Sequence, residues 1–490
     1  MIPMPRIEKL RAFLFENTSL RQTVAKNTIW QGVGITTSRL VKAVLVIYAA
    51  RLLGTHGYGI FSYALGIAGF FSVFSDIGLG GILTREASKA PSSLQTYFST
   101  TLVLKLIFTL ASFILIIGIT PFITNIPEAL PLIPLAALII ALDGLRDFVL
   151  TLARVKEKMQ IEAALHAITN ISITAFGLFA VLSQKTPAVL LLGYALGTAL
   201  GTISALWYFR EYLRNFWKFF ERTLVLTILK EAWPFAFVGV LGIVMTNTDT
   251  IMLGWFLDAE AVGLYTAALR PVQLFYFLPV ILSVSLFPPF ARLAGKNPEQ
   301  FRRVFEAALL LTFLLSLPLL AGGLVLSSDI IQFVFGPGYL EATPAFTVLL
   351  FTLLTNFPAA LLVNAIFAHG KQERYAGALF LGAIGNALLN VVFIPLYGIV
   401  GAAIATLTAQ LLAYGSMWYV LEHIAPFVLF RRLPRIVLAT LGMAGAVFLM
   451  KTLGLHILAT TILGAALYFI LLVLFKEPVL RHLNIKKLIS

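Results

Sequence analysis

The sequence predicts an all-α integral membrane protein with about fourteen transmembrane helices, built as two pseudo-symmetric six-helix lobes plus a C-terminal helix pair. Three observations support this fold class. Hydrophobic residues make up 59% of the 490-residue chain and charged residues only 12%, about half the charged share of a soluble domain, and the mean hydropathy is +0.93. Fourteen stretches reach the ~20 apolar residues that cross a bilayer. A short sequence pattern also recurs six predicted helices later.

The fourteen predicted spans follow one another closely, and no connection between them is long enough to form a soluble domain. They are 27–53, 58–80, 96–120, 130–152, 160–183, 187–209, 232–256, 261–288, 304–326, 343–368, 374–396, 398–421, 435–453 and 455–475. Residues 1–26 lack the uninterrupted apolar core and the small-residue cleavage site of a signal peptide. We expect these residues to form a basic segment on the cytoplasmic surface.

Lysine and arginine are distributed unequally between the two sets of loops, which sets the orientation because cytoplasmic loops retain these residues. With the N-terminus inside, the cytoplasmic segments hold 28 of the 36 Lys and Arg residues, whereas the opposite side holds only Lys185 and Lys451. We therefore predict a multi-pass protein of the cell (plasma) membrane with both termini cytoplasmic. The same distribution accounts for most of the net charge of +14, so we expect no nucleic-acid partner.

An internal repeat relates the junction between the first two predicted helices to the junction between the seventh and eighth. The stretch "ARLLGTHGYGIFSYALGI" at 50–67 aligns with "IMLGWFLDAEAVGLYTAAL" at 251–269, and "SALWYF" at 204–209 has its counterpart "SMWYVL" at 416–421. Two halves with the same orientation imply a pseudo-two-fold axis along the membrane normal and a site between the halves. The alternative is that turns of glycine, aromatic and small residues recur by chance.

The repeat defines the predicted domain organisation. Residues 27–209 form an N-lobe of six helices, 210–231 a cytoplasmic linker and 232–421 a C-lobe of six helices. Residues 422–490 hold the thirteenth and fourteenth helices and a cytoplasmic tail. Because this last pair falls outside the repeat and carries no deep charge, we expect it to be an accessory to the two lobes.

The same junctions resemble those of a known family. The stretches "ARLLGTHGYGIFSYA", "DIGLGGILTREASK" and "DTIMLGWFLDAEAVGLYTAALRPVQLFYFLP" are similar to the oligosaccharide flippase (polysaccharide exporter, or polysaccharide biosynthesis protein) family of the multidrug/oligosaccharidyl-lipid/polysaccharide superfamily, over essentially the whole chain. The resemblance implies two lobes in a V around a central cavity and no ATPase domain. It also implies that undecaprenyl- or dolichol-linked oligosaccharides are moved from the cytoplasmic leaflet to the outer leaflet by alternating access.

Several charged residues lie deep in the predicted N-lobe helices, where each charge costs about 2.5–3.5 kcal/mol on insertion scales. They are Arg39, Lys42, Lys105, Asp143, Arg146 and Asp147. Since that cost disfavours positions that face lipid, we expect these side chains to face a wet interior. The four bases suit a diphosphate, which Arg binds with a planar fork and Lys with a point charge. Asp143 and Asp147 are candidate coupling or gating residues, the alternative being that Arg146 merely pairs with one of them while the other bases extend toward the interface.

The C-lobe carries two deep charges of opposite sign. Asp249 and Arg270 each lie about ten residues from the turn between their helices, so at about 1.5 Å per residue they reach a similar depth. We predict an ion pair, which is either a fixed strut or a pair that breaks when Asp249 takes a proton or Na⁺ and Arg270 binds the phosphate. Asn386 and Asn390, one turn apart, either line the cavity or form hydrogen bonds between helices.

The predicted function is therefore a flippase for polyprenyl-diphosphate-linked oligosaccharide, and not an enzyme. A lipid II flippase and a multidrug or cation antiporter of the same superfamily are the alternatives, although cationic drugs would require a more acidic interior. A membrane glycosyltransferase is disfavoured because the longest outer loop, around 326–343, offers only Asp329 and Glu341.

Cysteine is absent and no metal or phosphate-binding motif is visible, so we expect no cofactor or metal apart from a coupling H⁺ or Na⁺. Expected partners are the lipid-linked oligosaccharide and membrane lipids, with a glycan polymerase or glycosyltransferases as further candidates.

Overall fold

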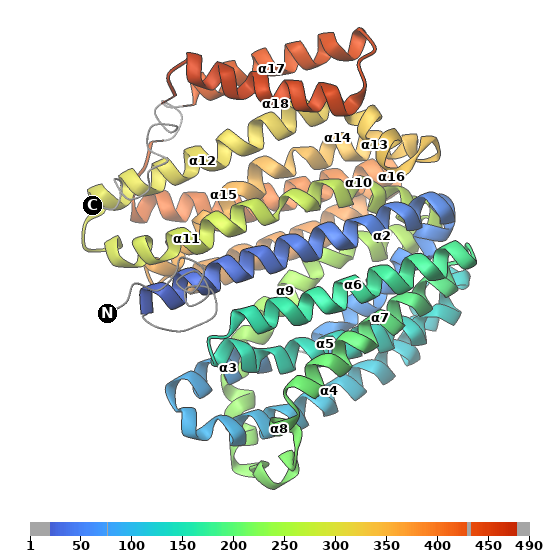
Figure 1. Cartoon of the computed structure of the whole chain (residues 1–490), viewed down its shortest axis with the longest axis vertical. Coiled ribbons are helices and arrows are strands. Elements are labelled where there is room, and N and C mark those ends of the chain that lie inside the picture. The colour runs from blue at the N-terminus through green and yellow to red at the C-terminus, as the bar shows by residue number, and fades with distance from the viewer. Residues whose placement is uncertain (1–19, 76, 429–432, 478–490) are drawn as a thin grey trace, which may run out of the picture. The chain divides into compact units, whose positions relative to one another are not determined.

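A computed structural model describes residues 20–75, 77–428 and 433–477 (Figure 1). These residues form helices joined by short connections, and no strand occurs among them. The structure thus confirms the predicted all-α membrane fold. Residues 1–19 of the predicted N-terminal segment and residues 478–490 of the predicted tail lie outside the described part of the chain.

Twelve helical stretches within the described residues are long and apolar enough to cross a membrane. Two of these stretches lie in α2 (Leu20–Phe71) and α16 (Gln372–Ile424), and each is interrupted by a glycine with non-helical backbone angles, Gly54 and Gly398. Dividing the two stretches at these glycines raises the count from twelve to fourteen. The result agrees with the number of spans that the sequence predicts.

Both glycines let the chain double back on itself. In α2, the Lys42 Nζ lies 5.4 Å from the centre of the Tyr194 ring, and the Phe61 ring lies 6.2 Å from the same ring. In α16, the Asn386 Nδ2 lies 3.4 Å from the Thr406 Oγ1. A straight helix would separate each pair by roughly 30 Å along its axis, so each of these elements is a hairpin of two helices.

Among the described residues, the first compact unit comprises 20–75, 77–247 and 258–260. Its helices, besides α2, are α3 (Leu79–Lys89), α4 (Leu94–Ile123), α5 (Ile133–Val155), α6 (Met159–Ser183), α7 (Pro187–Tyr208), α8 (Arg210–Leu213) and most of α9 (Arg222–Phe256), with short 3-10 turns at Ser72–Phe74, Pro91–Ser93, Pro127–Leu132 and Phe216–Phe219. A core of buried side chains from α3, α4, α5 and α9 holds these helices together. Within this core Phe98 of α4 stacks on Phe148 of α5, with ring centres 5.7 Å apart.

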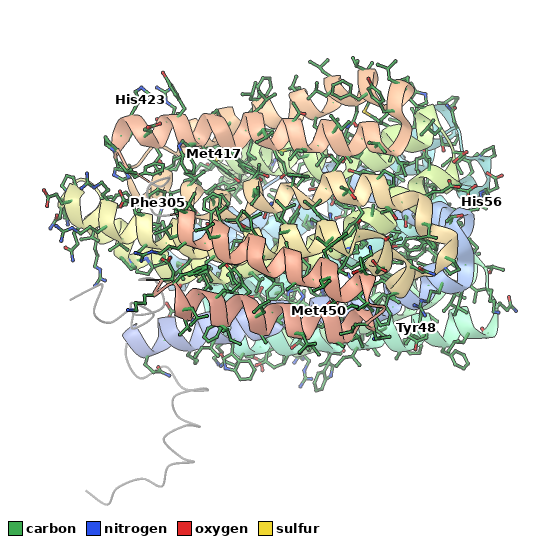
Figure 2. All side chains as sticks on the ribbon, turned by 90° about the horizontal axis from the view of Figure 1, so that it is seen from above. Tyr48, His56, Phe305, Met417, His423 and Met450 are labelled. Atoms are coloured by element: carbon green, nitrogen blue, oxygen red, sulfur yellow. The ribbon has the colours of Figure 1, made fainter. Side chains whose placement is uncertain are left out.

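The described residues of the second compact unit are 248–257, 261–428 and 433–477. Its helices are the rest of α9 and of α10 (Ala259–Phe275), then α11 (Phe277–Leu293), α12 (Pro298–Val325), α13 (Ser327–Phe335), α14 (Thr343–Leu350), α15 (Thr352–Ala368), α16, α17 (Pro434–Thr452) and α18 (Ile457–Leu474), with a 3-10 turn at Pro337–Ala342. Phe305 and Met417 belong to its buried core, whereas His423 is exposed at the end of α16 (Figure 2).

The last helix pair, α17 and α18, packs against α12 in the second unit. The Tyr468 hydroxyl donates a hydrogen bond of 2.8 Å to the carbonyl of Leu314. At the other end, Lys451 forms an ion pair of 2.7 Å with Asp329 and donates to the carbonyl of Val325. Lys451, one of the two bases predicted on the outer side, thus connects α17 to the end of α12 and to α13.

Helix α6, which carries several residues of the site described below, is held at close range by α7. A Cβ atom added at Gly193 of α7 would lie 2.6 Å from the carbonyl oxygen of Phe176, and one added at Gly197 would overlap the backbone of Ile173. Only glycine permits such an approach of two helix backbones. The small residues of α7 therefore fix the position of α6.

The division between the two units falls inside α9, between Asn247 and Thr248. The predicted boundary lay earlier, in the segment 210–231. The reason is that the first half of α9 packs on the first unit: Phe235 lies directly against Gly78, and Glu231 pairs with Arg85. A single continuous helix thus belongs to both units.

Replacement of Gly398 by alanine tests the hairpin of α16. Gly398 has φ 57° and ψ −134°, a combination that a residue with a Cβ atom adopts only at a cost of about 1–3 kcal/mol. We expect Gly398→Ala to lower the midpoint of thermal unfolding in detergent by a few degrees. Gly415→Ala is the matched control, because Gly415 is helical in the same element and an added Cβ meets nothing within 4 Å. Equal midpoints for the two variants would contradict the assigned hairpin.

Candidate functional site

A pocket of about 450 Å³ lies inside the first unit. Its walls come from the first half of α2, from α5 and from α6. The residues that line it are Trp30, Gly34, Ser38, Arg39, Lys42, Arg146, Arg154, Met159, Glu162, Ala163, His166 and Asn170. Three of the four bases that the sequence predicts for substrate binding in the N-lobe are among them.

Arg39 and Lys42 enter the pocket from α2. The register between the helices is set where Gly34 packs on Ala163 of α6, since a Cβ at Gly34 would lie 3.0 Å from that of Ala163. Arg39 and Lys42 are five and eight residues further along, about 7.5 and 12 Å deeper at 1.5 Å per residue. The Lys42 ammonium also lies over the Tyr194 ring at 5.4 Å, a favourable cation–π contact.

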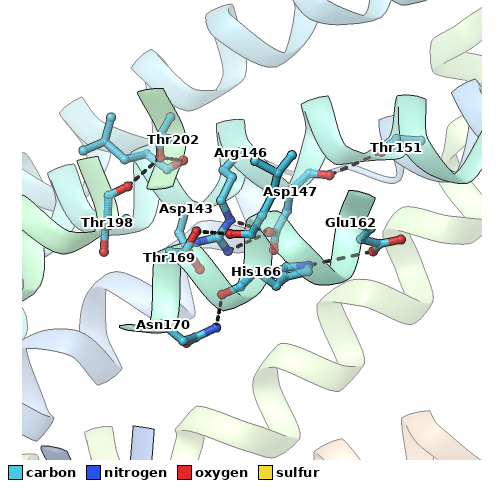
Figure 3. A network of polar contacts seen from close by, with 12 residues as sticks. Asp143, Arg146, Asp147, Thr151, Glu162, His166, Thr169, Asn170, Thr198 and Thr202 are labelled. Carbon is cyan, nitrogen blue, oxygen red and sulfur yellow. Dashed lines mark hydrogen bonds and ion pairs between the residues drawn. The ribbon is translucent and has the colours of Figure 1, made fainter. Parts of the chain in front are cut away.

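Arg146 lies on α5 and is held by two carboxylates of its own helix (Figure 3). Its Nη1 is 2.6 Å from Asp143 Oδ1, and its Nη2 is 2.7 Å from Asp147 Oδ1. Arg146 is 5% exposed, whereas the Asp143 and Asp147 side chains are 37% and 48% exposed. The interpretation that Arg146 pairs with its neighbours therefore holds, and Arg146 lines the pocket at the same time.

Lys105 has a different environment from the other three bases. It is fully buried on α4, and its Nζ donates a hydrogen bond of 2.8 Å to the carbonyl oxygen of Ser75. Ser75 follows the last turn of the second α2 helix, so the ammonium satisfies a carbonyl at a helix end. Lys105 is not among the residues that line the pocket, and its role in substrate binding stays a prediction.

A carboxylate that the sequence analysis did not single out also lines the pocket. Glu162, in the first turn of α6, accepts two hydrogen bonds at its Oε1 from Arg154 of α5, at 2.8 and 2.6 Å, and lies 3.8 Å from His166 Nε2. The spacing of four residues between Glu162 and His166 was the available signal for a shared helix face.

The charges that line the pocket are predominantly positive. Four bases, Arg39, Lys42, Arg146 and Arg154, face one acid, Glu162, for a formal charge of +3 with His166 neutral. Counting Asp143 and Asp147, which flank Arg146, lowers this sum to +1. The pocket therefore suits an anion that brings its own negative charge into a low-dielectric region, where Coulomb attraction is stronger than in water.

A second polar cluster lies in the second unit around Asp249 of α9. Asp249 is 4% exposed. Its Oδ2 accepts hydrogen bonds of 2.5 Å from the Tyr265 hydroxyl of α10 and from the Thr406 hydroxyl of α16. Its Oδ1 accepts bonds of 3.0 and 2.7 Å from the amides of Asn386 and Asn390. The two asparagines therefore form hydrogen bonds between helices, which was one of the two predicted roles.

The predicted ion pair between Asp249 and Arg270 does not form in this structure. Arg270 is exposed, and its Nη1 donates a hydrogen bond of 3.1 Å to Gln273 Oε1 on the same helix. Equal depth in the membrane did not bring the two side chains together, because depth fixes the position of a residue along a helix and leaves its face undetermined. Neutral donors satisfy the Asp249 carboxylate instead.

One oxygen in the Asp249 cluster lacks a donor. Within the described part of the chain, Asn390 Oδ1 is enclosed and has no hydrogen-bond partner. The described residues contain no group of three or more His, Cys, Asp or Glu side chains placed to hold a metal ion. The cluster thus consists of one carboxylate, which carries a single formal negative charge, and the hydroxyl and amide groups around it.

The fold and these two clusters can be compared with known proteins. The family described as polysaccharide biosynthesis protein matches residues 24–294, more than half of the chain, and the MatE family matches residues 234–396. The probable flippase AglR of Haloferax volcanii is 26% identical over 409 residues, which cover 77% of this chain and 79% of AglR. The putative O-antigen transporter of Shigella flexneri is 23% identical over 399 residues, covering 78% of this chain and 94% of that protein.

Solved structures show the same fold at low identity. The lipid II flippase MurJ in an inward closed conformation superposes with a TM-score of 0.74 at 17% identity, over 91% of this chain and 99% of MurJ. A MOP superfamily transporter from Pyrococcus furiosus gives a TM-score of 0.54 at 13% identity, over 84% of this chain and 98% of that one. These findings confirm the family that the sequence motifs resemble: the chain belongs to the polysaccharide biosynthesis protein family of the multidrug/oligosaccharidyl-lipid/polysaccharide superfamily.

Proposed function

We propose that this membrane protein is a flippase that moves a polyprenyl-diphosphate-linked oligosaccharide from the cytoplasmic leaflet to the outer leaflet by alternating access. The relatives described as a probable flippase and a putative O-antigen transporter support this class of function. The single observation that carries the proposal is the positively charged pocket of the first unit, with Arg39 and Lys42 at its deeper end.

The chemistry of the pocket matches the only part that such substrates have in common. Sugars and lipid tails differ between glycans, whereas a diphosphate always brings localised negative charge. Arg39 supplies a planar fork and Lys42 a point charge, and both form charge-assisted hydrogen bonds to phosphate oxygens that are stronger than neutral ones. Arg146 adds positive charge while its ion pairs with Asp143 and Asp147 stay intact.

Orientation and partners belong to the same proposal. The excess of Lys and Arg in alternate loops supports cytoplasmic termini in the cell membrane by the positive-inside rule. In that orientation the turn between α5 and α6, where Arg154 and Glu162 meet, faces the cytoplasm. A polymerase or glycosyltransferase acting on the same lipid-linked glycan is the expected neighbour in the membrane.

A lipid II flippase is the second candidate, favoured by the structural match to MurJ over almost the whole chain. Its substrate also carries a diphosphate on a polyprenyl chain, so the charged pocket suits both. A multidrug antiporter is disfavoured, because cationic drugs would meet the repulsion of Arg39, Lys42 and Arg154 at this site.

We propose further that the Asp249 cluster couples transport to a monovalent cation, Na⁺ or H⁺. Oxygen ligands from carboxylate, hydroxyl and amide groups are those that hard cations prefer. One negative charge neutralises a monovalent ion and would leave a divalent ion with an uncompensated charge inside the membrane. If the side-chain amides of Asn386 and Asn390 rotated by 180°, their oxygen atoms would face the ion in place of their N–H groups.

The substrate assignment is tested by Arg39→Ala and Lys42→Ala. Each removes a charge-assisted interaction worth about 1.5–3 kcal/mol, or roughly 10–100-fold in affinity. We expect flipping of a fluorescent undecaprenyl-diphosphate oligosaccharide in reconstituted vesicles to fall at least tenfold for both variants, with normal membrane insertion. Arg51→Ala is the control, since Arg51 is an exposed base near the outer end of the same helix and should leave flipping intact. Wild-type rates for both Arg39→Ala and Lys42→Ala would refute the site.

The coupling assignment is tested by Asp249→Asn, which keeps the shape of the side chain and removes its charge. We expect flipping by this variant to lose its dependence on an imposed Na⁺ or H⁺ gradient. Asp258→Asn provides the comparison, because Asp258 is an exposed carboxylate in the turn that follows the same helix. An Asp249→Asn protein that responds to the gradient as wild type does would leave Asp249 with a purely structural role.

A further inference from the structure

Glu162 stands out in the first unit because it is an acid inside a pocket lined mainly by bases. It is 8% exposed and shares the pocket with Arg39, Lys42, Arg146 and Arg154. A carboxylate at this position repels phosphate, and a site that bound only a diphosphate would be better without it. Its presence therefore requires a reason that the binding of phosphate does not supply.

The two oxygens of this carboxylate have different surroundings. Glu162 Oε1 accepts both hydrogen bonds from Arg154 and faces His166. Among the residues that the structure describes, Glu162 Oε2 is enclosed and has no hydrogen-bond partner. A buried charged acceptor without a donor is costly, more so than the 1–3 kcal/mol of a neutral group. The arrangement holds the carboxylate in place through one oxygen and leaves the other to be satisfied by something else.

The missing partner must be a hydrogen-bond donor, and an ionised diphosphate has none to offer. Water is one source of donors, and the hydroxyl or acetamido N–H groups of a sugar are another. Ala163, next to Glu162, lies level with Gly34 of α2, and from that level Arg39 and Lys42 are about 7.5 and 12 Å further along α2. One or two hexose rings attached to a diphosphate held at Lys42 and Arg39 span that distance.

We infer that Glu162 recognises the sugar next to the diphosphate, with Oε2 accepting a hydrogen bond from a ring hydroxyl or an acetamido N–H. This inference rests on the proposed function and adds a specificity-determining residue to it. Arg154 and His166 act as positioning residues, since they hold the carboxylate through Oε1. In this arrangement the bases bind the part that all substrates share, and the acid distinguishes a lipid that carries a sugar from one that does not.

The experiment compares two lipids on the full-length protein in nanodiscs: undecaprenyl diphosphate, and the same lipid bearing one N-acetylglucosamine. For the wild type we expect tighter binding of the sugar-bearing lipid. Glu162→Gln keeps the size of the side chain but loses the charged acceptor, a hydrogen bond worth roughly tenfold or more in affinity. We therefore expect this variant to bind the bare lipid at least as tightly as wild type does, because the repulsion between carboxylate and phosphate is gone, and to lose the preference for the sugar-bearing lipid by about tenfold.

The outcomes separate this inference from the proposal beneath it. If the wild type binds neither lipid, the diphosphate pocket itself is wrong. If the wild type binds both and Glu162→Gln weakens both equally, Glu162 acts on the phosphate through Arg154 and the sugar contact is refuted. An unchanged preference also refutes it. If the single variant unfolds, the double variant Arg154→Gln/Glu162→Gln takes its place, because it removes both charges of the pair. We expect the double variant to bind the two lipids with about equal affinity. A retained preference for the sugar-bearing lipid would refute the sugar contact.

Discussion

The cost of placing charge where water is scarce is the constraint on which the rest of this structure depends. Each deep charged group meets that cost with a different solution. Lys105 donates to a carbonyl at a helix end, Arg146 lies between two carboxylates, and Asp249 is surrounded by four neutral donors. Arg39 and Lys42 line a pocket, with Lys42 over the Tyr194 ring, and in the proposed function an anionic ligand would add to this balance. The partners of each charged group therefore help to separate charges that stabilise the fold from charges that are candidates for binding a ligand.

The two compact units contain polar clusters of opposite charge. The pocket of the first unit is lined by a surplus of positive charge, which suits an anion. The cluster of the second unit concentrates oxygen atoms around one carboxylate, which suits a small cation. Helix α9 contributes residues to both units, and Asp249 lies just past the point of division. The first half of the same helix packs against Gly78 and Arg85 of the first unit.

The sequence was sufficient for properties that depend on depth in the membrane and insufficient for those that depend on helix face. Hydropathy predicted fourteen spans, because it varies along the chain. Arg39 and Lys42 could be assigned to one face, since three residues separate them on a single helix. The predicted pair of Asp249 and Arg270 was wrong, because such a pair depends on how two helices are rotated about their axes. Glu162 was missed for a related reason: its significance comes from Arg154, a residue on another helix.

The most direct measurement is a cryo-electron microscopy structure of the protein in nanodiscs with undecaprenyl diphosphate bound. We expect density for the two phosphates inside the first unit, with phosphate oxygens within about 3 Å of the Arg39 guanidinium and the Lys42 ammonium, and with Arg146 still paired to Asp143 and Asp147. Phosphate density away from this pocket, with Arg39 and Lys42 contacting only protein, would contradict the assignment of the pocket as the diphosphate site.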